Sequence, residues 1–412
     1  MILLVAWAVS TGAGADGVDL SVFGKIGLET RWYPENAAYP GQRSHLFSVS
    51  SETTFLFVGE QDRSFTLTPY FRYDATDSER NLVDLREAYY LAYGDIGSNE
   101  WELRLGVDKV FWGVAELRNL VNIVNQVDLV ANPDEKTRMG QPMARLSLSG
   151  EWGALELIGM PYHRTRTYPG RGGRYRSVPI VDNDRATYES GSAEHHLDLA
   201  ARFSGYVGPV DLGLSVFRGT NRDPVFATFD PIRGVTVPYY DPIRRVLVPR
   251  YDLIRQYGLE AQVTTGPWLL KLEAIHRSGM RNLAGRKEDY VAALVGGEYT
   301  IYSVFDSAKD LGLIVEWISD GRDENTTTAF QNDLFLATRL SFNDVQSTEA
   351  VFSIALDLDT DSRSLDARVE RRLSDSWSLK ANATAIWDTE EDSFFHPVRQ
   401  DDYVSVILEY HF

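Results

Sequence analysis

From residue 19 to its end, this chain of 412 residues repeats one pattern, in which hydrophobic and polar residues alternate over segments of about ten residues. One segment has Trp101, Leu103 and Leu105 on one face and Glu102 and Arg104 on the other. A period of two is that of a β-strand with one apolar and one polar face. Short turns and long polar loops alternate between the segments. The sequence therefore predicts an all-β fold, a closed antiparallel transmembrane β-barrel of about 18 strands.

The last strand of this pattern ends the chain on an aromatic residue. Its two faces are formed by Val404, Val406, Leu408, Tyr410 and Phe412, and by Tyr403, Ser405, Ile407, Glu409 and His411. This ending resembles the closing strand of Gram-negative outer-membrane β-barrels. The resemblance implies a bacterial outer-membrane location, contact with outer-membrane lipid and lipopolysaccharide, and recognition of the strand ending in Phe412 by the barrel-assembly machinery.

Composition excludes several other classes of protein. The net charge of -18 argues against nucleic-acid binding. After the N-terminus the chain has no run of about 18 apolar residues, as a transmembrane helix requires. The absence of cysteine suits a chain that crosses an oxidising compartment. The seven histidines lie in no nucleophile or zinc motif, so we expect no cofactor, no metal site and no enzymatic activity.

The N-terminus is expected to be a targeting segment. An apolar run is followed by Ala13-Gly14-Ala15, which is typical of a signal-peptide cleavage site. The run lacks the usual positive charge before it, so the true start is expected upstream. We predict a signal peptide over residues 1–15 and a single outer-membrane barrel domain over residues 16–412.

The third long loop, residues 112–140, changes period from two to helical. Leu117, Leu120, Val121 and Val124 form an apolar stripe, which predicts a short helix in this third extracellular loop. The loop resembles, in position and helical content, the loop that folds into the lumen of porins. That resemblance implies a pore constriction formed by Glu116, Arg118, Asn122, Asn125, Gln126 and Asp128. The alternative is a helix that lies on the extracellular rim.

The inward faces of the predicted strands carry charges of both signs. The acidic positions include Glu260, Glu273, Glu316 and Glu409, and the candidate pore-wall arginines are Arg31, Arg72, Arg104, Arg145, Arg202, Arg339 and Arg368. Unpaired charges in a dry core cost several kcal/mol each, so the lumen must be wet or densely paired.

Two further loops are unusual. Residues 163–192 contain a cluster of arginines, which could gather anions or the phosphates of lipopolysaccharide, or could be a solvated loop. Residues 220–250 contain a tandem repeat of Asp-Pro-Ile-Arg units beginning at Asp230 and Asp241. This repeat predicts a hairpin or lid; a partner-binding surface and duplication without function remain the alternatives.

Together these features resemble an outer-membrane porin, a channel for passive diffusion of small hydrophilic solutes that is narrowed by an in-folded loop at residues 112–140. The resemblance also raises the homotrimer as an assembly, which the sequence does not decide. Two other functions stay open: a plugged structural or assembly barrel that binds a partner protein, and an outer-membrane hydrolase.

Overall fold

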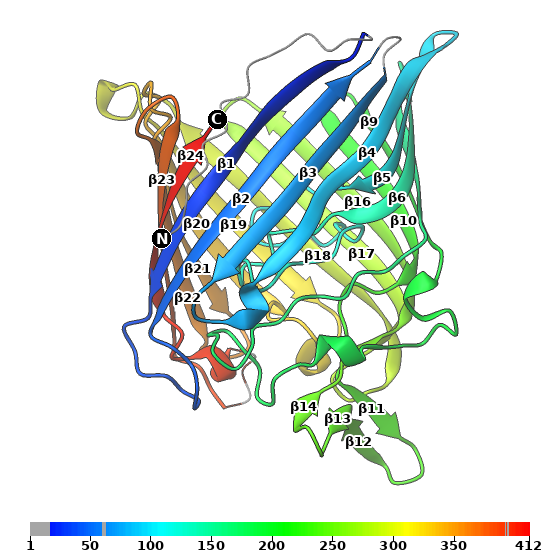
Figure 1. Ribbon diagram of the computed structural model, residues 1–412, viewed down its shortest axis with the longest axis vertical. Helices are drawn as coiled ribbons and strands as arrows, with labels where there is room; N and C mark the ends of the chain where they lie inside the picture. Colours follow the sequence, from blue (N-terminus) through cyan, green and yellow to red (C-terminus); the bar gives the residue numbers. More distant parts are fainter. Residues whose placement is uncertain (1–16, 60–62, 392, 394) are drawn as a thin grey trace.

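The computed structural model describes residues 17–59, 63–391, 393 and 395–412 (Figure 1). The predicted signal peptide at residues 1–15 lies outside these described residues. Within them, strands form one closed wall around a lumen, and long connections gather at one end (Figure 1).

The wall contains 18 strands, as the period-two pattern predicted. They are β1 (Asp19–Trp32), β2 (His45–Val58), β3 (Arg63–Asp74), β4 (Leu82–Ile96), β5 (Asn99–Asp108), β6 (Gln141–Gly150), β7 (Gly153–Met160), β9 (Asp198–Val207), β10 (Val210–Thr220), β16 (Leu253–Thr265), β17 (Trp268–Arg281), β18 (Lys287–Ile301), β19 (Asp310–Asp320), β20 (Asn332–Ser341), β21 (Glu349–Asp357), β22 (Arg363–Arg372), β23 (Trp377–Trp387) and β24 (Tyr403–His411). Each strand pairs antiparallel with its neighbours along the wall.

The first and last strands close the barrel. β1 pairs with β24 from Lys25 opposite His411 to Trp32 opposite Val404. Beyond this ladder, the backbones of Gly24 and Phe412 exchange two hydrogen bonds of 3.0 and 3.1 Å. A side chain at Gly24 would place its Cβ 2.4 Å from the carbonyl oxygen of Glu52, so the close approach of three strands here requires glycine. Closure leaves the barrel wall without an exposed strand edge.

The connections define two ends. Turns such as residues 97–98, 151–152, 208–209 and 266–267 lie at the short-turn end, where the last residue of the chain also lies (Figure 1). The long loops meet at the opposite, long-loop end. The three longest are residues 109–140, 161–197 and 221–252.

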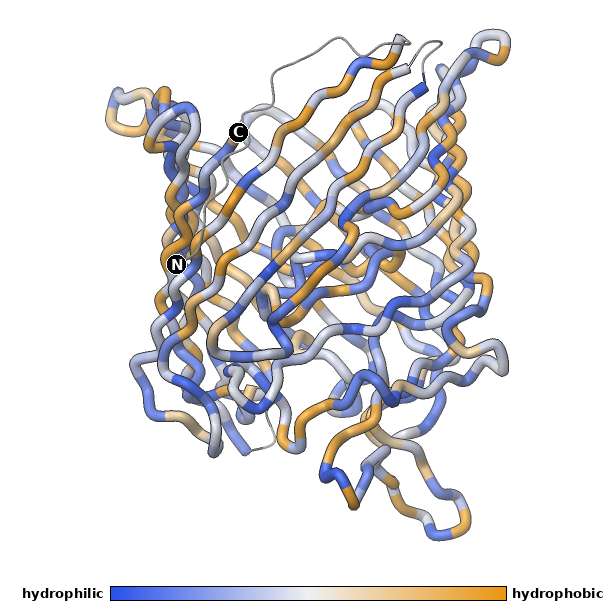
Figure 2. The backbone as a smooth tube through the Cα atoms, viewed as in Figure 1, coloured by the Kyte–Doolittle hydropathy of each residue, from blue (hydrophilic) through white to orange (hydrophobic). Residues whose placement is uncertain are grey.

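The outer surface of the wall is apolar. Hydrophobic and hydrophilic residues alternate along the strands in Figure 2, and the outward positions include Leu214 and Phe352, whose exposed fractions are 54% and 52%. Aromatic side chains pair on this surface near the short-turn end, as in Trp268 with Tyr299 and Trp377 with Tyr410. Exposed apolar side chains flanked by aromatic ones are typical of a transmembrane β-barrel.

The long loops contain short elements of their own. Two hairpins, β11 (Ala227–Asp230) with β12 (Val235–Pro238) and β13 (Tyr240–Asp241) with β14 (Val246–Leu247), extend beyond the barrel at the long-loop end (Figure 1). They correspond to the tandem repeat, because Asp230 and Asp241 each begin a hairpin turn. Their carboxylates accept hydrogen bonds from the amides two and three residues later. In addition, β8 (Thr187–Tyr188) pairs in parallel with β15 (Arg250–Tyr251).

Helical structure among the described residues is limited to six single turns. These 3-10 turns are η1 (Ser78–Arg80), η2 (Asn183–Arg185), η3 (Ala193–His195), η4 (Val304–Asp306), η5 (Asp323–Asn325) and η6 (His396–Val398). No helix in the described part of the chain is long and apolar enough to cross a membrane.

The short helix predicted within residues 112–140 is therefore wrong: this loop contains no helical turn. The apolar stripe is real, since Val121 and Val124 are buried in the hydrophobic core cluster with Leu120 packed against it. The backbone amides at the start of the stripe, however, donate to carboxylates of the barrel wall instead of to carbonyls four residues earlier.

The two faces of one strand should respond oppositely to a charge. We expect Phe352→Arg, on the outward face of β21, to lower the free energy of unfolding in lipid vesicles by about 2–4 kcal/mol, because the guanidinium enters hydrocarbon. Ser353→Arg places the same group one residue further, on the lumen face opposite Asp366, and should cost far less. Denaturant titration of both variants measures the difference; equal losses would contradict the assigned faces.

Candidate functional site

The loop of residues 109–140 crosses the lumen. It joins β5 to β6 and makes polar contacts with β17, β19 and β20, which lie across the barrel from β5 and β6 in the strand order. Near the start of the loop, Nε1 of Trp112 donates a hydrogen bond of 3.0 Å to the carboxylate of Glu156 in β7. The third long loop thus lies inside the barrel and not on its rim.

Glu273 of β17 anchors the loop through backbone amides. Its Oε1 accepts from the amides of Val114 at 2.7 Å and Ala115 at 2.9 Å, and its Oε2 accepts from those of Leu120 at 2.6 Å and Val121 at 3.3 Å. The residue is fully buried. Its carboxylate therefore substitutes for the carbonyl acceptors that a helix would have supplied.

Glu316 of β19 is the second anchor. Its two oxygens accept from the amide of Glu116 at 2.8 and 3.1 Å, and from that of Leu117 at 2.7 Å. Like Glu273, it is fully buried and has no ion-pair partner among the described residues. Hydrogen bonds to an ionised acceptor are roughly twice as strong as neutral ones, so these two side chains hold the loop firmly.

Two glycines make room for the anchors. Gly296 of β18 lies between the anchoring strands, and a Cβ there would lie 2.5 Å from the Glu316 side chain. Gly113 has a φ of +119°, and its Cβ would lie 2.7 Å from Oε1 of Glu273. Only glycine permits both the conformation and the approach at position 113.

Glu116 carries charge on the accessible edge of the loop. Its Oε1 lies 3.2 Å from Nζ of Lys271 and 3.1 Å from a guanidinium nitrogen of Arg339, which also pairs with Glu298 at 3.1 Å. Burial alone would raise the pKa of Glu116, but the attraction of Lys271 and Arg339 outweighs it and lowers the pKa. The side chain remains about one-third exposed.

The other predicted constriction residues are less accessible. Arg118 pairs with Glu135 at 3.2 Å, and Asn122 is buried. Asn125, Gln126 and Asp128 are fully buried and hold the loop to its surroundings.

Three contacts show how these buried side chains act. The side-chain oxygen of Asn125 accepts a hydrogen bond of 2.8 Å from the amide of Val110, and Nε2 of Gln126 donates to the carbonyl of Arg164 at 3.2 Å. Asp128 accepts from Arg86 at 3.0 Å and from Thr167 at 2.8 Å. The structure thus brings Glu116 and Arg118 to the partly open edge, and uses the more distal side chains as internal supports.

All seven candidate wall arginines have a carboxylate partner in or beside the lumen. The pairs are Arg31 with Glu29, Arg72 with Asp128, Arg104 and Arg145 with Glu102, Arg202 with Glu260, Arg339 with Glu116, and Arg368 with Asp134. Those with Asp128, Glu116 and Asp134 join the wall to the in-folded loop. The sequence placed these arginines on the inward face. Glu29 and Glu102 lie in the same strand as Arg31 and Arg104, whereas the partners of Arg72, Arg339 and Arg368 come from the in-folded loop.

Burial of the wall is uneven. Inward side chains of β16 to β19, such as Gln256, Lys271 and Glu316, are buried beneath the loop. Inward side chains of β22 are open: those of Arg368 and Glu370 are 50% and 46% exposed. The loop therefore covers one side of the lumen and leaves a polar, solvent-accessible strip of wall on the other.

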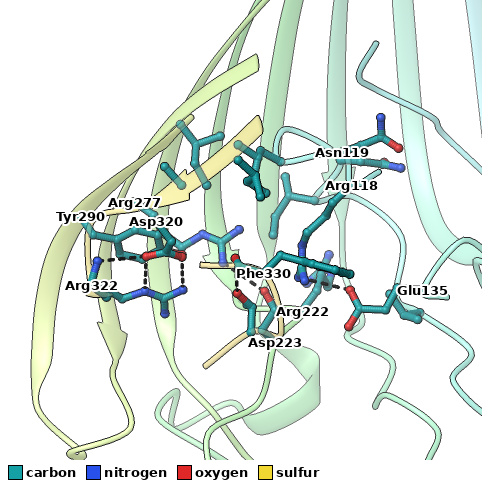
Figure 3. A pocket seen from close by; sticks show the side chains of 18 of the residues that line it. Arg118, Asn119, Glu135, Arg222, Asp223, Arg277, Tyr290, Asp320, Arg322 and Phe330 are labelled. Atoms are coloured by element: carbon teal, nitrogen blue, oxygen red, sulfur yellow. Dashed lines mark hydrogen bonds and ion pairs between the residues drawn. The ribbon is translucent and has the colours of Figure 1, made fainter. Parts of the chain in front are cut away.

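A pocket lies between the loop and the covered wall (Figure 3). The space that is free of protein atoms here, about 590 Å³, includes open solvent at the mouth of the pocket. Figure 3 shows Arg118 and Glu135 of the loop beside Asp223, Arg277, Asp320 and Arg322. Within the described residues, no group of three or more His, Cys, Asp and Glu side chains is placed to hold a metal ion.

Removing the anchor charges should free the loop. In a Glu273→Gln/Glu316→Gln variant, each carboxamide keeps one acceptor oxygen and turns an NH₂ group toward amide donors. We expect a loss of at least about 2 kcal/mol of loop anchoring per site. Trypsin should then cleave after Arg118 in the folded barrel. Glu370→Gln in β22 is the matched control, and equal protection of all variants would contradict the anchoring role.

Comparisons with known proteins show only distant similarity. No family model and no curated protein matches it. Solved structures that match include two mutants of the Rh. blastica porin, at 11% and 12% identity and TM-scores of 0.41 and 0.42; each alignment covers 95% of this chain and 100% of the porin. TM-scores this low carry no argument about function. From its own strand pairing and its apolar outer face, the chain is a closed, 18-stranded transmembrane β-barrel.

Proposed function

We propose that this protein is an outer-membrane channel for passive diffusion of small hydrophilic solutes, narrowed by the in-folded loop of residues 109–140. The uneven burial of the lumen wall carries this proposal. If the loops only filled the barrel, the charged side chains of β22 would be buried as those of β17 and β19 are. Their exposure instead supports a water-filled passage between the loop and the open strip of wall at β22.

The charges along this passage would act as the filter. Glu116, Asp134 and Lys136 lie on the loop, and Arg339 and Arg368 lie on the wall. Arg118 supports the loop edge through Glu135, while Asn122, Asn125, Gln126 and Asp128 keep the loop in place. Opposed charges of this kind orient water and dipolar solutes and set which ions pass.

The setting that we propose is the bacterial outer membrane. The apolar outer face would contact lipid, the long-loop end would face the exterior and lipopolysaccharide, and the strand that ends at Phe412 would be read by the barrel-assembly machinery. A homotrimer is compatible with this arrangement. No step in the proposed function needs a cofactor or an enzymatic reaction.

A plugged barrel is the second candidate, and one observation favours it. At the long-loop end the loops bind one another: Arg174 of the 161–197 loop pairs with Asp401 at 3.1 Å, and Arg222 of the 221–252 loop donates to the carbonyl of Val124 at 3.0 Å. Such interlocking could close the mouth until a partner protein binds. A membrane containing this barrel would then show no conductance without the partner.

Removing the charge of Glu116 should change ion selectivity. In Glu116→Gln, the partly exposed Arg339 and the buried Lys271 lose their shared carboxylate, so we expect the chloride-to-potassium permeability ratio to rise about twofold or more. The reversal potential of single channels in a planar bilayer under a KCl gradient measures this ratio. Glu390→Gln, in the exposed loop after β23, is the control for a change of net charge.

The same experiment tests the channel itself. A silent bilayer with correctly folded protein would contradict passive diffusion and support the plugged barrel. An unchanged reversal potential in Glu116→Gln would show that the passage lies elsewhere in the lumen.

A further inference from the structure

The pocket between the in-folded loop and the covered wall has more positive than negative charge. Six arginines line it, Arg118, Arg138, Arg166, Arg222, Arg277 and Arg322, against three carboxylates, Glu135, Asp223 and Asp320. Two of the arginines are neutralised in pairs of their own. Arg222 pairs with Asp198 at 2.8 Å, and Arg322 pairs with Asp320 at 2.6 Å.

The remaining four arginines are accompanied by only two carboxylates, which pair with three of them. Asp223 lies between Arg166 and Arg277, at 3.1 Å from the latter. Glu135 lies between Arg118 at 3.2 Å and Arg166 at 3.5 Å. Arg138 has no ion-pair partner among the described residues; it donates instead to the carbonyl of Asn125 at 3.2 Å. This part of the pocket therefore carries two positive charges in excess.

The surroundings make that excess costly. Burial lowers the pKa of Arg138 to about 10; the charges of Glu135 and Asp223 raise this pKa, and those of Arg166 and Arg118 lower it. The pKa of Asp223 is lowered strongly because Arg166 and Arg277 outweigh its burial, so this carboxylate stays ionised. A partly buried cluster of like charges is unfavourable until a counter-charge enters. The opening at Arg118 and Glu135 remains partly exposed.

Apolar side chains complete the lining. Ile123 comes from the loop, Ile275, Ala292 and Ile318 come from the wall, and Phe330 comes from the connection after β19. Arg322 lies over the ring of Tyr290, 3.9 Å from its centroid, which fixes one side of the cavity. A hydrated inorganic ion gains little from such a surface, whereas a short carbon chain buries area against it.

We propose that this pocket is a binding site for small organic dicarboxylates. Two carboxylates balance the two excess charges, and the planar guanidinium groups of Arg118 and Arg138 suit carboxylate oxygens. The apolar floor takes the carbon chain between them. This inference goes beyond the proposed channel function, because the pocket lies on the covered side of the loop and not in the passage along β22.

Calorimetric titration of the purified, detergent-solubilised protein with succinate tests the site. We expect saturable binding of one succinate per chain, weaker binding of inorganic phosphate, and none of the neutral analogue succinamide. Arg138→Gln and Arg118→Gln should each weaken succinate binding on the order of tenfold, because each removes a charge-assisted contact. Arg233→Gln, on the exposed first hairpin, removes the same charge far from the pocket and should leave binding unchanged.

Each outcome separates this inference from the channel function. KCl conductance without succinate binding would overturn the dicarboxylate site and leave the channel intact. Succinate binding without any conductance would overturn the channel and keep the site. Phosphate that binds more tightly than succinate would overturn the organic class, and equal weakening by Arg233→Gln would show mere screening by net charge. If Arg138→Gln fails to fold, as judged by heat-modifiable migration, Arg118→Gln, in a more exposed side chain, still decides.

Discussion

Hydrogen bonding between two wall carboxylates and loop amides determines what the lumen contains. Glu273 and Glu316 are buried, and without the amides of residues 114–121 they would be unsatisfied charges beneath the loop. Those amides in turn would lack acceptors, since the segment forms no helix. The wall carboxylates and the loop amides therefore satisfy each other's hydrogen bonds, and both can be buried. The covered wall, the open strip at β22 and the arginine-lined pocket all follow from the loop being held on this side of the barrel.

The barrel could be predicted from the sequence because a wall strand is defined by its neighbours two residues apart. Hydrophobic residues at alternate positions fix which face meets lipid, and the seven inward arginines followed from the same alternation. The paired register of β1 and β24 also agrees with the faces expected from the last residues of the chain.

The loop could not be predicted in the same way. Leu117, Leu120, Val121 and Val124 have helical spacing, and that spacing does describe which side chains are buried together. Whether a helix forms depends on where the amides find acceptors, and here the acceptors are more than 150 residues away in the sequence. Gly113 and Gly296 were the available signals, since glycines at a loop start and within a strand mark close approach. The pairing of Arg118, Arg166 and Arg277 with two carboxylates depends on three loops meeting at the wall, which no local pattern encodes.

The sequence distance between the loop and its anchors also has a consequence for how the barrel is made. The amide of Glu116 bonds a carboxylate that lies 200 residues later in the chain, so the loop cannot settle while only the first half of the wall exists. Contacts of such long range form slowly, because the intervening chain must first be ordered. The loop can therefore take its final place only after β19 has been added to the wall. Errors in assembly would therefore leave a barrel whose wall is complete but whose interior is wrongly filled.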